Sequence, residues 1–110
     1  MMLQILITLF TILVVNGEAV SQTASLPRQH IVEIQAFRFQ PQRVVVKPGD
    51  TIVWVNRDIV PHTVTANGGT WKSHPLGEGQ SWQVVVEANG VSSYFCEFHP
   101  HMTGVLVTKS

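Results

Sequence analysis

The sequence predicts an all-β protein in which about seven to eight short strands form two sheets packed face to face as a sandwich. Short runs rich in Val, Ile, Thr and aromatic residues recur along the chain, as is typical of half-buried strands. Turn residues such as Pro48-Gly49-Asp50 and Asn67-Gly68-Gly69 separate these runs. After the first 19 residues, no window of about 11 residues keeps the apolar spacing of a helix without an interrupting Pro or Gly. These observations together favour an antiparallel sandwich.

The expected strands follow from the same pattern, each ending where turn chemistry begins. They cover residues 31–36, 43–46, 51–56, 63–66, 81–86, 92–96 and 104–108. Aromatic side chains on or beside these runs are expected in or near the core, because packing is the commonest role of such residues. These are Phe37, Phe39, Trp54, Trp82, Tyr94 and Phe95.

The first 19 residues differ from the rest of the chain. Residues 1–15 carry no charged side chain, and the small residues Gly17 and Ala19 follow at the spacing that a signal peptidase accepts. This apolar run is shorter than the roughly 20 residues needed to cross a bilayer. We therefore expect a signal peptide over residues 1–19, a flexible lead-in over 20–29 and one domain over 30–110. A membrane anchor or a buried segment is the alternative. The product is expected to be periplasmic or otherwise exported, with no membrane span once the signal is removed.

Charge and cysteine content exclude some functions. Lys plus Arg and Asp plus Glu both number 7 among 110 residues, so the formal net charge is zero. Nucleic-acid binding calls for a clustered basic surface and is not expected. Small exported domains usually pair their cysteines in disulfides, but Cys96 has no partner within the chain. It is therefore an inert thiol, an intermolecular bridge, a nucleophile or a metal ligand.

A metal site is the interpretation that the neighbours of Cys96 favour. His99 lies three residues after Cys96 and Met102 three further, in what the pattern predicts to be one loop between two strands. His62 follows a different strand, and the two segments meet if the strands ending at Asn56 and Cys96 are neighbours. Thiolate and thioether suit Cu(I), whereas imidazole also suits Cu(II), so this donor set favours one copper ion. Zinc is the rival, but structural zinc sites usually employ two or more cysteines or paired histidines.

The same residues carry a resemblance to the cupredoxin (type 1 blue copper) family, within it to amicyanin, pseudoazurin and plastocyanin. The similar stretches are Phe37-Arg38-Phe39-Gln40-Pro41, Val46-Lys47-Pro48-Gly49-Asp50, Trp54-Val55-Asn56-Arg57-Asp58, Pro61-His62-Thr63-Val64 and residues 96–102. The resemblance implies a Greek-key β-sandwich with copper at one end, bound by His62, Cys96, His99 and axially by Met102. Two positions depart from it. Thr63 stands where Asn is frequent, and its hydroxyl is expected to link the two ligand segments instead. His101 stands where an apolar residue is frequent, and we expect it to be a solvated residue at the rim of the site.

The expected function is one-electron transfer by a small monomeric blue-copper protein whose redox partner docks near His99. Ile59, Val60, Pro61 and Pro100 are expected to surround the His99 ring as an uncharged apolar collar. The alternative is a copper-binding or delivery module without redox turnover. An enzyme with Cys96 as nucleophile is disfavoured because no Gly-rich oxyanion loop accompanies it, so no catalytic residues are assigned. His30 and His74 receive no role.

Overall fold

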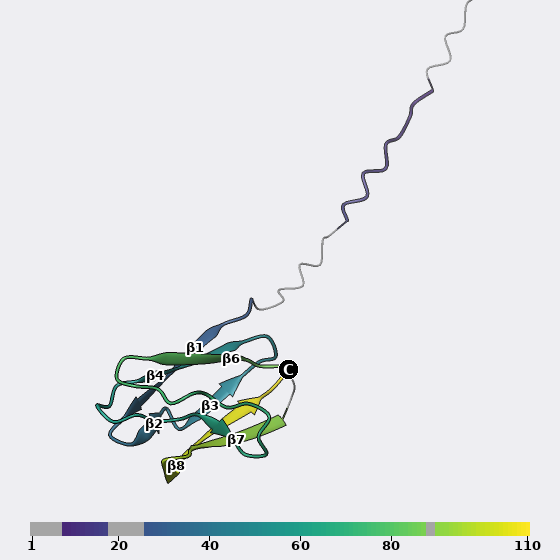
Figure 1. Cartoon of the computed structure of the whole chain (residues 1–110). Coiled ribbons are helices and arrows are strands. Elements are labelled where there is room, and N and C mark those ends of the chain that lie inside the picture. The colour runs from purple at the N-terminus through teal and green to yellow at the C-terminus, as the bar shows by residue number, and fades with distance from the viewer. Residues whose placement is uncertain (1–7, 18–25, 88–89) are drawn as a thin grey trace, which may run out of the picture.

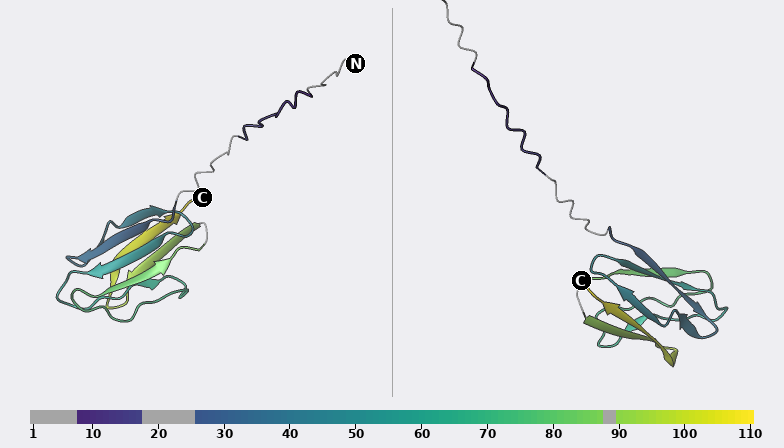
Figure 2. Two further views of the ribbon diagram at one scale, coloured as in Figure 1. Left: turned by 90° about the horizontal axis from the view of Figure 1, so that it is seen from above. Right: turned by 180° about the vertical axis from the view of Figure 1, so that it is seen from behind.

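The computed structural model describes residues 8–17, 26–87 and 90–110 and confirms the β-sandwich (Figure 1). The strands are β1 (Gln29–Gln35), β2 (Arg38–Gln40), β3 (Arg43–Val46), β4 (Thr51–Asn56), β5 (Thr65–Ala66), β6 (Ser81–Val85), β7 (Gly90–Cys96) and β8 (His99–Thr108). One sheet has the order β2-β1-β4-β6, and the other has the order β3-β8-β7-β5. Figure 2 shows the two layers from above and from behind.

The two sheets are mixed, so the expectation of a purely antiparallel sandwich is wrong. β1 pairs with β4 in parallel, and β3 pairs with β8 in parallel. The remaining pairs are antiparallel. The chain leaves the first sheet after β2, forms β3 in the second sheet and returns as β4, so that β4 runs in the same direction as β1. The alternation of side chains along a single strand does not show that the chain crosses between the two sheets, so the parallel pairs could not be predicted from it.

Strand boundaries agree best where turn residues flank a Val-rich run. β3 and β4 have the expected bounds, whereas the fourth expected strand is reduced to the two residues of β5. The three residues of β2 were not predicted, because a run this short lacks a visible alternation. The last strand begins at His99 rather than at residue 104, so the segment after Cys96 is a hairpin and not an open loop.

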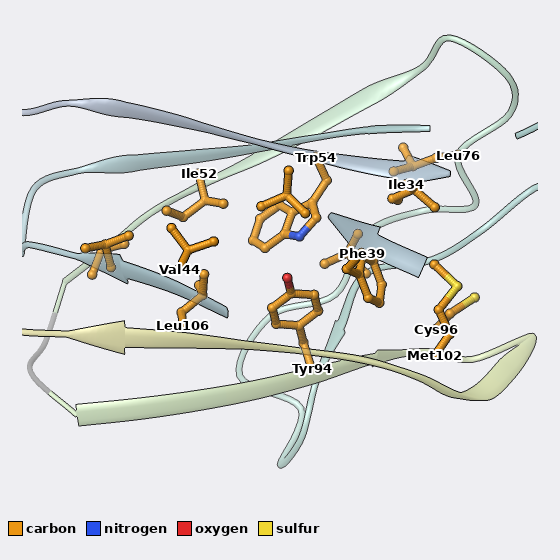
Figure 3. Close-up of a cluster of buried hydrophobic side chains, with 14 residues drawn as sticks. Ile34, Phe39, Val44, Ile52, Trp54, Leu76, Tyr94, Cys96, Met102 and Leu106 are labelled. Atoms are coloured by element: carbon orange, nitrogen blue, oxygen red, sulfur yellow. The ribbon is translucent and has the colours of Figure 1, made fainter. Parts of the chain in front are cut away.

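The core lies between the sheets and is built around aromatic side chains (Figure 3). Trp54 and Tyr94 are fully buried, and their ring centroids lie 5.3 Å apart. Trp71, which the sequence pattern did not single out, packs against Trp54 at 5.5 Å. Phe39 is buried as expected, but Phe37 is not a core residue, since 49% of its surface is exposed. Phe37 therefore does not contribute to the core as predicted.

Asp50 anchors the beginning of the domain. Its carboxylate accepts hydrogen bonds from the backbone N–H groups of Arg28 and Lys47 and pairs with Nε2 of His30 at 2.9 Å. The backbone bond from Arg28, the bond from Lys47 and the contact with His30 lower the pKa of Asp50 to about 2. β1 begins at Gln29, one residue before the expected domain boundary.

Much of the predicted signal peptide and lead-in, residues 1–7 and 18–25, lies outside the described residues. Within the described ranges, the structure contains no helix long and apolar enough to cross a membrane.

Candidate metal centre

Three of the predicted ligands meet at the end of the sandwich where β7 turns into β8. Sγ of Cys96 lies 3.6 Å from Nδ1 of His62 and 3.7 Å from Nδ1 of His99. One potential ligand atom from each of the three residues lies within 4.8 Å of the other two. His62 and Cys96 are fully buried, and His99 is half-buried.

His62 reaches the site from the segment between β4 and β5. β4 and β7 belong to different sheets, so the two ligand segments do not meet through neighbouring strands, which was the condition given for their meeting. The segment is instead held in place by paired backbone hydrogen bonds between His62 and Leu76 of 3.1 and 2.8 Å. The buried Asn56 adds two more links, because its Nδ2 donates to the carbonyl oxygens of Val60 and Leu76. The position of His62 therefore depends on the long connection between β5 and β6.

The β7–β8 hairpin supplies the other three predicted ligands. Cys96 lies opposite His99 across a turn of two residues, while Phe95 lies opposite Thr103. Three residues of β8, Pro100 to Met102, therefore have no counterpart on β7 and form a bulge. Met102 turns back into the core, where only 5% of its surface is exposed. Figure 3 shows the sulfur atoms of Cys96 and Met102 at the same end of the core.

The separations fit a metal ion held between sulfur and nitrogen. Bonds of about 2.3 Å to sulfur and about 2.0–2.1 Å to nitrogen, at angles of roughly 110–120°, place the two donor atoms about 3.6–3.8 Å apart. The observed distances of 3.6 and 3.7 Å agree with these values. The cluster offers one thiolate and two imidazoles, with a buried thioether at the same end of the core. This mixture of soft and borderline donors is typical of a copper site, whereas structural zinc sites usually have two or more cysteines or paired histidines.

Asp58 orients the His62 ring. Its Oδ2 lies 2.8 Å from Nε2 of His62, so Nε2–H donates to the carboxylate and the lone pair of Nδ1 faces Cys96. Burial raises the pKa of Asp58, but hydrogen bonds from the Phe37 N–H, His62 and the Ala36 N–H outweigh this effect and lower the pKa overall. No role was predicted for Asp58 from the sequence. The available signal was a carboxylate four positions before a candidate ligand.

Thr63 joins the two ligand segments as expected. Its Oγ1 accepts a hydrogen bond of 2.8 Å from the backbone N–H of Glu97. Its own backbone N–H points to Sγ of Cys96 at 3.4 Å. A backbone N–H in this position helps to fix the sulfur where it would bind a metal.

The four residues predicted to form an apolar collar around the half-buried His99 are exposed. Ile59 is 85% exposed and Val60 is 37% exposed, and both Pro61 and Pro100 are exposed. Phe37 and Phe98 add two half-exposed rings that were not expected there. Of the other three histidines, His101 and His74 are exposed, and His30 pairs with Asp50.

Fold and site together define a copper-binding β-sandwich, and comparison with known proteins gives its family. Residues 27–109 match the model of the copper-binding proteins of the plastocyanin/azurin family. The chain belongs to this family, and its cofactor is one copper ion.

Individual relatives agree with this assignment. Amicyanin of Paracoccus versutus is 26% identical over 86% of this chain and 76% of its own length. Amicyanin-alpha of Methylorubrum extorquens is 30% identical over 71% of this chain and 70% of its own. A solved purple cupredoxin from Nitrosopumilus maritimus has 28% identity and a TM-score of 0.68, over 73% of this chain and 99% of its own. The relatives are similar in both sequence and fold.

Proposed function

We propose that this protein carries single electrons at a type 1 copper site whose ligands are His62, Cys96, His99 and Met102. The observation that carries the proposal is the approach of two imidazole nitrogens to one sulfur, at 3.6 and 3.7 Å. Copper bound there would supply a Cu(II)/Cu(I) couple, which exchanges one electron.

The surrounding residues favour exchange without rearrangement. Asp58 fixes the His62 ring, the Thr63 hydroxyl links the two ligand segments, and the Thr63 N–H helps to fix the sulfur. Because these contacts hold the ligands in place, the ligands should rearrange little when the metal gains or loses an electron. Four protein ligands also leave no open position for a substrate, which favours a carrier over an enzyme.

The first experiment is to add Cu(II) to the metal-free protein and record its visible spectrum. An intense thiolate-to-copper band that is absent from Cys96→Ala supports the proposal. A weak spectrum that is the same in both proteins contradicts it, because the sulfur then takes no part in binding.

We further propose that a redox protein docks on the apolar collar formed by Ile59, Val60, Pro61 and Pro100 around His99. A small apolar face suits brief encounters, because it binds weakly and releases quickly. Pro61→Glu and Pro100→Glu should each slow reduction by the partner while leaving the copper spectrum intact. Gln83→Glu, on the exposed face of β6, adds the same charge elsewhere and is the control. Equal rates in the three variants and the wild type would count against this face.

Export completes the proposal. Residues 1–19 are proposed to direct the chain out of the cytoplasm, to the periplasm in a bacterium with two membranes, where the product acts as a monomer. Mass spectrometry of the exported protein tests the cleavage after Ala19. An intact N-terminus in the mature product would contradict it.

A further inference from the structure

Phe37 contacts both histidine rings of the metal centre. Its ring centroid lies 5.3 Å from that of His62 and 4.8 Å from that of His99, and both contacts are edge-to-face with an interplanar angle of 89°. The two histidine rings are themselves 5.2 Å apart. The three rings therefore contact one another in pairs. Phe37, which is half exposed, packs against both predicted ligand rings.

The two-residue hairpin turn between β1 and β2 places Phe37 there. Ala36 and Phe37 have φ values of 53° and 58°, in the left-handed region that is unfavourable for residues with a Cβ atom. The carboxylate of Asp58 holds this turn, since it accepts the backbone N–H groups of Ala36 and Phe37 at 2.8 and 3.0 Å. The same carboxylate binds Nε2 of His62 at 2.8 Å. One side chain thus fixes both the strained turn and a ligand ring.

The two histidines differ in what holds them. His62 is fully buried and has the carboxylate of Asp58 on its Nε2. His99 is half-buried, and within the described part of the chain its Nε2 has no hydrogen-bond partner. The edge-to-face contact with Phe37 is the closest ring contact that His99 makes there. Packing against Phe37 therefore does for His99 what a hydrogen bond does for His62.

We propose that Phe37 is a positioning residue of the copper site, which holds the His99 ring in its ligand orientation before the metal binds and while the metal is bound. This inference deepens the proposed function and rests on it only for the identity of the metal. The two-residue turn between β1 and β2, with positive φ at both Ala36 and Phe37, brings this ring over the site. Loss of the ring leaves His99 free to rotate about its side-chain torsions, so that a metal bound by it dissociates faster.

Four variants test the role of the ring. Phe37→Ala removes the ring but leaves a Cβ atom at a position with positive φ. Phe37→Gly also removes the ring, and Gly adopts positive φ without that penalty, so an effect shared by both variants is not due to poor folding of the turn. Phe37→Tyr keeps the ring and should behave as wild type. Phe98→Ala is the matched control, because Phe98 is 51% exposed at the same end of the molecule and makes no ring contact with either histidine among the described residues.

Two measurements are made on each variant. The first is the set of His99 ring signals in the NMR spectrum of the metal-free protein, and the second is the rate at which bound Zn(II) is lost to excess chelator. We expect broadened or multiple His99 signals in Phe37→Ala and Phe37→Gly. Zinc release should be on the order of tenfold faster in both, as expected for the loss of two edge-to-face ring contacts. Phe37→Tyr and Phe98→Ala should match the wild type in both measurements.

Wild-type ring signals and zinc release in Phe37→Ala and Phe37→Gly would overturn the proposal. An equal effect of Phe98→Ala would also overturn it, since any loss of apolar surface would then suffice. Neither measurement uses the redox chemistry of copper. If the wild-type copper protein shows no reversible reduction, the proposed electron transfer fails while the role of Phe37 remains testable.

Discussion

Replacing Thr63 by Val tests the link between the two ligand segments. Val has nearly the shape of Thr, so the substitution opens no cavity at a residue that is only 1% exposed. It removes the oxygen that accepts the Glu97 N–H at 2.8 Å and that lies 3.2 Å from Oγ1 of Thr65. Leaving a partly buried donor unsatisfied costs about 1–3 kcal/mol. We therefore expect the free energy of unfolding to fall by about 2 kcal/mol.

Urea unfolding of the metal-free protein measures this loss. With an m-value of about 1–2 kcal/mol/M, the midpoint should fall by roughly 1–2 M. Thr63→Ser keeps the hydroxyl and loses one buried methyl group, which costs only about 0.8 kcal/mol, so it should be the more stable of the two variants. A Thr63→Val protein as stable as the wild type, or more stable than Thr63→Ser, would refute the role given to the hydroxyl.

Two further predictions concern the rest of the domain. A Cβ atom on Gly104 would overlap the ring of the fully buried Tyr94, so Gly104→Ala should lower stability. The expected loss in the free energy of unfolding, measured by thermal unfolding, is about 3 kcal/mol. Gly77→Ala is the control and should be nearly neutral, because its Cβ would approach only the Gln80 side chain, at 3.4 Å. Equal losses in the two variants would contradict this packing. Asp50 has a folded pKa of about 2 against an ordinary value of 3.8, a difference worth about 2 kcal/mol of stability. Because its folded pKa is lowered, this contribution is complete above pH 3.8 and lost as the pH falls toward 2. Asp50→Asn should lose less stability over that interval, and an equally steep loss would exclude the carboxylate as its source.

Local pattern was enough for strands that stand between clear turns. β3 and β4 have the predicted bounds because a Val-rich run ends at Pro48-Gly49 and at Arg57-Asp58. The beginning of β8 was not predictable in this way. Pro100 and His101 are typical of a loop, yet the backbone there continues as a bulged strand of the hairpin. Pairing with the preceding strand β7 decides this segment, and the alternation of side chains along one strand does not record it.

The meeting of His62, Cys96 and His99 was predictable because metal chemistry restricts which residue types can share a site. The residues that support these three were harder to identify. Asp58 acts partly through a turn some 20 positions earlier in the chain, which no local pattern indicates. Phe37 was assigned to the core because most aromatic residues are buried, and nothing in its identity indicates a left-handed backbone. Contacts between segments far apart in the chain determine both roles.

A reversible reduction of the copper-loaded protein tests the central claim most directly. In a potentiometric titration, the visible band should disappear and return along one curve that fits the transfer of a single electron, with the copper retained throughout. Copper that binds but is released on reduction, or that cannot be reduced and reoxidised, would contradict the account and favour a protein that delivers copper without redox turnover.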